Sequence, residues 1–171
     1  MSVHVRTLRP DDGPLLDAVL AGLSPHNRYL RFHSPLPRVP AGIRRALLDV
    51  DGCRHLALVA LAGPGEPVGI ARAVRDADHP AEAEVAFEVV DAWQRRGVGR
   101  LLLTAVAERA AAAGITRLHA MVLAENRPAL ALMRAVFPLC LSRRDGAVVE
   151  LTALLGGAEI TMDDVVADLA A

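Results

Sequence analysis

The segment from Trp93 to Leu102 is the part of the chain that most constrains its fold. Its residues, Trp-Gln-Arg-Arg-Gly-Val-Gly-Arg-Leu-Leu, lie between an alternating polar and apolar stretch at 82–90 and an alanine-, leucine- and arginine-rich stretch at 97–113. The first stretch predicts a strand and the second a long helix. Glycines at such a turn let backbone N–H groups approach an anion, and the helix start adds unpaired donors and a favourable dipole. Three basic side chains lie in the same segment: Arg95, Arg96 and Arg100. The segment therefore predicts a site for a pyrophosphate group.

The two best-known nucleotide-binding glycine motifs do not fit this segment. A dinucleotide-binding motif requires a third glycine where this chain has Leu102, and an acidic residue about 20 positions further on, near His119. A Walker-type phosphate loop requires a lysine, and all 19 basic residues of this chain are arginine. Both motifs are excluded.

The order of the predicted elements gives a single α/β domain. Alternating or apolar runs predict seven strands, at 3–6, 55–62, 68–75, 82–90, 117–123, 139–143 and 147–154. Helical spacing and start signals predict helices at 15–23, 27–32, 43–50, 97–113 and 126–136. We expect a mixed, mostly antiparallel central sheet of about six to seven strands flanked by helices. The domain covers residues 1–155. An extension at 156–171 follows, in which Thr161-Met162-Asp163-Asp164 resembles the start of a short helix.

The spacing of Gln94, Gly97 and Gly99 resembles the signature of the GNAT N-acetyltransferases, Gln/Arg-x-x-Gly-x-Gly/Ala. A second stretch, Ala124-Glu125-Asn126-x-x-Ala129-x-x-Leu132, is similar to the segment whose asparagine contacts the cofactor arm in that family. The order of elements from about Val3 to Leu154 also matches the family fold. The resemblance implies acetyl-CoA as the co-substrate and no metal ion. The alternative interpretation is a glycine-containing helix start that serves only packing.

The resemblance also implies how acetyl-CoA is held. In that family the strand before the motif is bulged and separates from its neighbour, and the pantetheine arm forms strand-like hydrogen bonds in the gap. The residues expected to bind the co-substrate are Phe87, Glu88, Val89, Gln94, Arg95, Arg96, Gly97, Val98, Gly99, Arg100 and Asn126.

A carboxylate is needed because an alkylammonium, with a pKa of about 10.4, must lose a proton before its nitrogen can attack a thioester. Glu82, Glu84 and Glu88 share one face of the predicted strand. The stretch 83–87 resembles the glutamate-bearing strand of protein lysine acetyltransferases, which makes Glu84 the first catalytic candidate and Glu88 the second. The alternative is a solvated strand face. Many GNAT enzymes have a proton-donating tyrosine where this chain has Met133, so we expect solvent to protonate the leaving thiolate here.

The acceptor is suggested by the stretch Ser24-Pro25-x-x-Arg28-Tyr29-Leu30-Arg31-Phe32, which looks like the first helical region of bacterial protein lysine acetyltransferases that act on acyl-CoA synthetases. A protein lysine, on a partner such as an acyl-CoA synthetase-like protein, is therefore the leading acceptor. A small-molecule amine acetyltransferase, acting on an amino acid, polyamine or antibiotic, is the second hypothesis. A non-catalytic acyl-CoA-binding module is the third. The fused regulatory domain common in those bacterial proteins is not found in this sequence.

Composition narrows the partners further. The formal net charge of −1 argues against general nucleic-acid binding. No apolar run approaches the ~18 residues of a membrane span, and no export signal is evident, so we expect a cytoplasmic protein. Cys53 and Cys140 are isolated in the sequence, so we expect two buried thiols and no metal site. The oligomeric state, monomer or homodimer, is left open.

Overall fold

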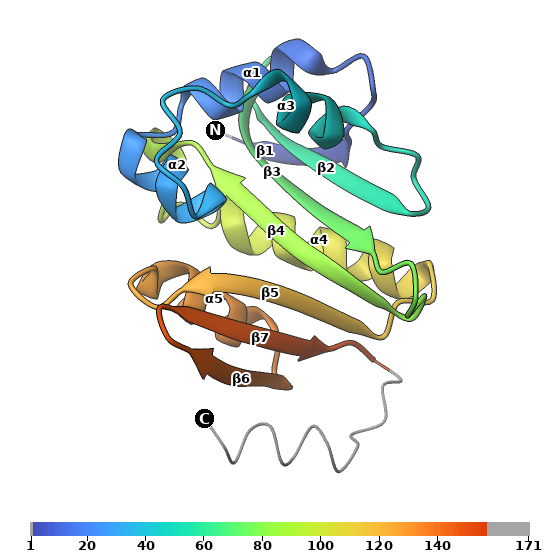
Figure 1. The fold of residues 1–171 in the computed structure, drawn as a ribbon. Coiled ribbons are helices and arrows are strands. Elements are labelled where there is room, and N and C mark those ends of the chain that lie inside the picture. Colours follow the sequence, from blue (N-terminus) through green and yellow to red (C-terminus); the bar gives the residue numbers. More distant parts are fainter. Residues whose placement is uncertain (1, 157–171) are drawn as a thin grey trace.

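The computed structural model describes residues 2–156, which form one seven-stranded mixed sheet with helices on both faces (Figure 1). The strands are β1 (Val3–Thr7), β2 (His55–Ala62), β3 (Glu66–Arg75), β4 (Glu82–Val89), β5 (Arg117–Leu123), β6 (Cys140–Asp145) and β7 (Val148–Leu154). The helices are α1 (Gly13–Ala21), α2 (Pro25–Phe32), α3 (Ala41–Leu48), α4 (Val98–Ala112) and α5 (Arg127–Val136), with a 3-10 turn η1 at Asp91–Trp93. The expected fold class is confirmed.

The strand order is β1-β2-β3-β4-β5-β7-β6. Strands β1 to β4 pair antiparallel through short connections, whereas β4 and β5 pair parallel. A parallel pair needs a crossover connection, and here the long helix α4 supplies it. Strand β7 pairs antiparallel with both β5 and β6.

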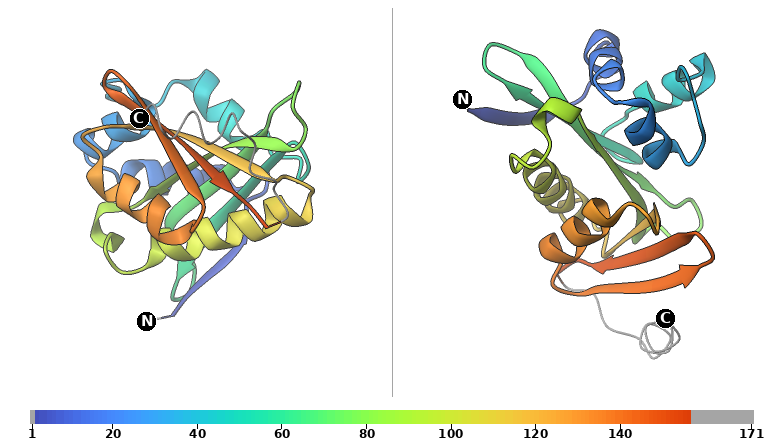
Figure 2. Two further views of the ribbon diagram at one scale, coloured as in Figure 1. Left: turned by 90° about the horizontal axis from the view of Figure 1, so that it is seen from below. Right: turned by 90° about the vertical axis from the view of Figure 1, so that its left-hand side faces the viewer.

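The two faces of the sheet are covered by different helices (Figure 2, right). On one face, α4 packs its apolar stripe, which includes Leu102, Leu103 and Val106, together with Met133 of α5. On the other face, α1 and α3 cover the opposite side chains of β2 and Ile70 of β3. Alternation along the strands directs side chains into two separate cores in this way.

Strands β4 and β5 are paired only at their beginning. The parallel register covers Glu82 to Glu84 of β4 against Arg117 to His119 of β5, and no pairing follows beyond that point. The expected bulge in β4 is wrong, because the β3–β4 register runs without a shift from Gly69↔Val89 to Arg75↔Ala83. The strands therefore separate without a bulge in β4, and side-chain alternation along β4 is preserved.

The expectations for the two cysteines and for a C-terminal helix have different outcomes. Cys53 is exposed and Cys140 is half-buried, so the expectation of two buried thiols is wrong. Cys53 lies in the loop before β2, where the chain turns at the surface. The expected helix at Thr161 lies outside the described residues. Among residues 2–156, no helix has the length and apolar character of a bilayer span.

Candidate active site

The start of α4 presents free backbone donors at the end of β4. Gly97 is the N-cap and has φ 84°, a left-handed conformation that glycine adopts without strain. The first intrahelical bond at this end runs from the Leu101 N–H to the Gly97 carbonyl. The N–H groups of Val98, Gly99 and Arg100 therefore have no partner within the helix. No acidic residue lies in the first turn, so the positive end of the helix dipole remains uncompensated and suits an anion.

The three arginines of the motif surround this helix start. Arg95 is exposed and has φ 57°, an unusual value for a residue that is not glycine. The Arg96 guanidinium lies 5.2 Å from the centre of the Trp93 ring. Arg100 donates to the carbonyl of Ala135 at 3.3 Å, next to α5. Positive charge thus gathers where the helix donors are free.

Gln94 and Gly99 connect the motif to its surroundings. The Gln94 amide donates to the Val89 carbonyl at 3.2 Å, which fixes the turn against the end of β4. A Cβ atom placed on Gly99 would lie 2.8 Å from Leu132 Cδ2, so this glycine lets α4 approach α5 closely. The sequence left open whether this glycine serves an anion or packing, and the structure shows a packing requirement.

The edge of β4 that faces β5 is open at its C-terminal half. The Val90 N–H donates to the carbonyl of Val68 in β3. Because backbone N–H and C=O groups alternate in direction along a strand, those of Glu88 also point towards β3. The backbone groups of Phe87 and Val89 consequently point towards the unpaired side. Phe87 and Val89 are therefore suitably placed to pair with an extended ligand in the gap.

Asn126 is the N-cap of α5, and its side-chain oxygen accepts a hydrogen bond from the Ala129 N–H at 3.2 Å. Within residues 2–156 its amide nitrogen has no hydrogen-bond partner, so it is available to a ligand. Met133, at the position of the absent tyrosine, is fully buried in the core beneath α4, where it packs. Tyr29 lies in α2 and is half-buried.

The three glutamates of β4 share a face but differ in environment. Glu88 is buried, with 1% of its side chain exposed, and both of its carboxylate oxygens are bound. Arg31 Nε lies 2.7 Å from one oxygen and an Arg72 guanidinium nitrogen lies 3.1 Å from the other. Burial alone would raise the pKa of Glu88, but the combined attraction and hydrogen bonds of the two arginines hold that pKa below its usual value.

Glu82 is also occupied. Its carboxylate lies 2.9 Å from Nε2 of His119 on β5, while Nδ1 of the same ring lies 3.1 Å from the Thr152 hydroxyl on β7. With the imidazole neutral, Nε2–H donates to Glu82 and Nδ1 accepts from Thr152. Sequence reasoning missed this cluster, because nothing in the sequence pairs β4 with β5 and β5 with β7.

Glu84 is exposed, and within residues 2–156 its carboxylate has no hydrogen-bond or ion-pair partner. It lies at the last pair before β4 and β5 separate, between Val74 on β3 and His119 on β5. Of the three glutamates, Glu84 therefore has the carboxylate that is most available to a proton from an incoming group.

The start of α4 suits an anion, and the open edge of β4 beside it suits an extended arm. Together the two elements fit an acyl-CoA. Residues 24–137 match the family model described as the acetyltransferase (GNAT) family. The chain belongs to this family.

Several relatives are similar to this GNAT domain. The acetyltransferase Pat of Mycolicibacterium smegmatis is 33% identical over 127 residues, which cover 72% of this chain and 37% of that protein. The chain thus corresponds to little more than a third of that relative's length. The GNAT domain of S. lividans PAT has a TM-score of 0.81 and 32% identity, with 90% of each chain covered. The yncA protein of Salmonella typhimurium, solved with acetyl-CoA, has a TM-score of 0.70 and 15% identity and covers 94% of this chain and 98% of its own.

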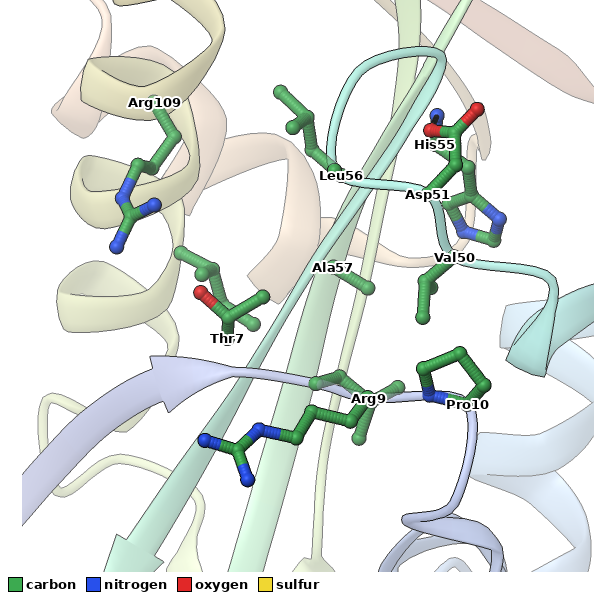
Figure 3. Close-up of a pocket in the computed structure, with 12 residues that line it drawn as sticks. Thr7, Arg9, Pro10, Val50, Asp51, His55, Leu56, Ala57 and Arg109 are labelled. Atoms are coloured by element: carbon green, nitrogen blue, oxygen red, sulfur yellow. Dashed lines mark hydrogen bonds between the residues drawn. The ribbon is translucent and has the colours of Figure 1, made fainter.

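A separate pocket of about 230 Å³ lies beside β1, β2 and the C-terminal part of α4 (Figure 3). Its side chains come from the end of β1, the loop before β2, β2 itself and α4, and include Arg9, His55 and Arg109. No residue of the glycine motif or of β4 lines it. The pocket is therefore distinct from the start of α4 and the open edge of β4. Within residues 2–156, no group of side chains is suited to hold a metal ion.

Gly97→Ala should separate the ligand role of the helix start from its backbone strain. Gly97 and Gly114 both have positive φ, and a Cβ atom at either position would meet nothing within 4 Å. Alanine at each should cost about 1–2 kcal/mol of unfolding free energy, because both adopt the left-handed conformation. Only Gly97→Ala should also weaken acetyl-CoA binding, measured by calorimetry. Equal affinities in the two variants would argue against an anion site at α4.

Proposed function

We propose that this protein transfers the acetyl group of acetyl-CoA to a primary amine, and that the amine is a protein lysine side chain. The observation that carries the proposal is the exposed, unpartnered carboxylate of Glu84 at the point where β4 and β5 separate. The similarity to the GNAT domain of S. lividans PAT supports it.

Bound acetyl-CoA supplies an acetyl thioester, and the residues of this chain bind it, orient it and receive a proton. The free N–H groups of α4, with Arg95 and Arg96, bind the pyrophosphate. The backbone of Phe87 and Val89 pairs with the pantetheine arm. The carboxylate of Glu84 takes one proton from the substrate ammonium, directly or through a water molecule. The neutral nitrogen then forms a bond to the carbonyl carbon and the carbon–sulfur bond breaks. The nitrogen releases its second proton to solvent, which leaves a neutral amide, and the CoA thiolate takes a proton from solvent.

The surroundings of Glu84 favour a protein acceptor. Its neighbours on the same face of the sheet are exposed, with Val74 43% and Met121 59% accessible. A lysine on a protein surface extends far enough to reach such an open position, whereas a small amine gains little affinity without enclosing walls. The small-amine alternative is favoured by one feature: Glu82 and Glu84 place two carboxylates together, which attracts a cation.

Acetyl-CoA turnover against a panel of acceptors tests the proposal. We expect acetyl-lysine to form on acyl-CoA synthetase-type proteins and not on amino acids, polyamines or aminoglycosides. Because the chain has no lysine, a tag-free preparation should show no acetylation of its own side-chain amines by intact-mass analysis. The N-terminal amine is then the possible site of self-acetylation, and any acetyl-lysine comes from the acceptor alone. Turnover on small amines only would favour the second hypothesis, and tight acetyl-CoA binding without any turnover would indicate a binding module.

A further inference from the structure

Helix α2 differs from the other helices in how it is held. None of its eight residues is fully buried, whereas α1, α3, α4 and α5 each bury at least one side chain. Phe32, at its end, packs only partly against the core beneath α1 and α3. Apolar burial therefore contributes little to fixing the position of α2, and polar contacts must hold it.

Most of these polar contacts are local. The Ser24 hydroxyl caps the helix by accepting from the Asn27 N–H at 3.2 Å. Arg28 donates to four carbonyl groups in the segments just before and after α2: those of Leu20, Leu23, Leu36 and Pro37. These bonds fix the shape of the loop around α2 but do not connect it to the sheet.

Within residues 2–156, two side-chain contacts join α2 to β4 and the turn after it. Asn27 donates to Asp91 at 2.9 Å in an exposed position. Arg31 donates to Glu88 at 2.7 Å, where 18% of the Arg31 side chain and 1% of the Glu88 side chain are exposed. The Arg31–Glu88 contact is thus the one that is shielded from water.

The Glu88 carboxylate extends this connection to α3. Its second oxygen binds Arg72 of β3, and Arg72 also donates to the Leu47 carbonyl at 2.9 Å. Arg72 Nε is buried without a hydrogen-bond partner within residues 2–156. A buried ion cluster with an unsatisfied donor stabilises a fold less than apolar packing of similar volume does. The cluster instead fixes the orientation of α2 relative to the sheet, because charge-assisted hydrogen bonds tolerate little misalignment.

The position that these bonds fix lies beside the proposed reaction centre. Helix α2 lies beside the C-terminal end of β4 (Figure 1), on the face of the sheet that carries Glu88, and it contacts β5 as well as β4. It therefore spans the region where β4 and β5 have separated. An amine that approaches Glu84 from this face meets α2 as one wall, whereas the free N–H groups of α4 lie beyond the end of β4.

We infer that the Arg31–Glu88–Arg72 cluster positions α2 as the wall of the acceptor site, and that Arg31 is a positioning residue for the acceptor and not for acetyl-CoA. This inference rests on the proposed acetyl transfer. Arg31 does not touch the reacting atoms. It acts through Glu88, by keeping α2 over the gap between β4 and β5.

Arg31→Gln tests the inference, with Arg31→Lys as the conservative variant. The amide cannot supply the charged bond, so the KM for the amine acceptor should rise roughly tenfold or more, since small displacements of positioning groups have large effects. The dissociation constant for acetyl-CoA should change less than twofold. Arg31→Lys retains the charge and should recover part of the loss. Arg143→Gln is the matched control, because Arg143 pairs with the exposed Glu150 on the β6–β7 hairpin, away from α2.

Hydrogen exchange of the α2 amides provides a readout that does not depend on turnover. We expect faster exchange at residues 28–33 in Arg31→Gln and unchanged exchange there in Arg143→Gln. An unchanged acceptor KM, or a parallel loss of acetyl-CoA affinity, would overturn the inference. If the wild type acetylates no amine, the proposed function fails. In that case exchange still decides whether Arg31 holds α2.

Discussion

Glu84→Gln should lower acetyl-transfer turnover at neutral pH by about 10²-fold or more, while acetyl-CoA affinity stays unchanged. Glutamine keeps the shape of the side chain but cannot accept the substrate proton. The loss should diminish as the pH rises, because a lysine acceptor, with a pKa of about 10.4, then arrives already deprotonated. Steady-state kinetics between pH 7 and 10, with binding measured separately, would detect both effects.

The matched controls are Glu82→Gln and Glu88→Gln. The Glu82 carboxylate is engaged by His119 and the Glu88 carboxylate by two arginines, so neither should reproduce the selective, pH-dependent loss of turnover. Normal turnover in Glu84→Gln combined with loss in Glu82→Gln would move the base to Glu82 and leave the fold unaffected. Full activity in all three variants would mean that β4 supplies no base and that proximity alone drives the reaction.

Glu88→Gln should destabilise the folded protein by roughly 3–5 kcal/mol, because removal of one member of a buried ion cluster leaves the other charges uncompensated. That is a large share of the 5–15 kcal/mol typical of a domain. The folded-state pKa of Glu88 is lowered, so its ionisation stabilises the fold fully above its unfolded pKa of about 4.3. This contribution is lost as the pH falls through the folded pKa. Urea unfolding between pH 7 and pH 3 should therefore show the two proteins converging in acid.

The exposed Glu84 is the internal control for stability, since Glu84→Gln should change the unfolding free energy by less than about 0.5 kcal/mol. A second control replaces Arg31, Arg72 and Glu88 together by apolar residues of similar size. Such replacement of a buried ion cluster is often neutral or stabilising, so this variant should recover most of the loss. A Glu88→Gln protein as stable as the wild type at pH 7 would contradict the charge balance described for the cluster.

The pattern of residues along the sequence was sufficient to predict the main helices and strands of the fold. Alternation at 82–90 predicted β4, and helical spacing with start signals predicted helices at 27–32 and 126–136, close to the observed α2 and α5. Local propensity, capping and periodicity act within a few residues, so they can be read along the chain. The glycine motif likewise predicted a helix start with free donors at Gly97, because that property is also local.

The sequence by itself determined the positions of the seven strands, the helix start that suits an anion and the shared face of Glu82, Glu84 and Glu88. Tertiary structure alone decided how these glutamates differ. Arg31 lies 57 positions from Glu88 and His119 lies 37 positions from Glu82, so their contacts arise only when α2 and β5 pack against β4. The predicted bulge failed for a related reason. The β3–β4 register has no shift, and β4 and β5 nevertheless pair only from Glu82 to Glu84, which is a property of the assembled sheet and not of the local sequence.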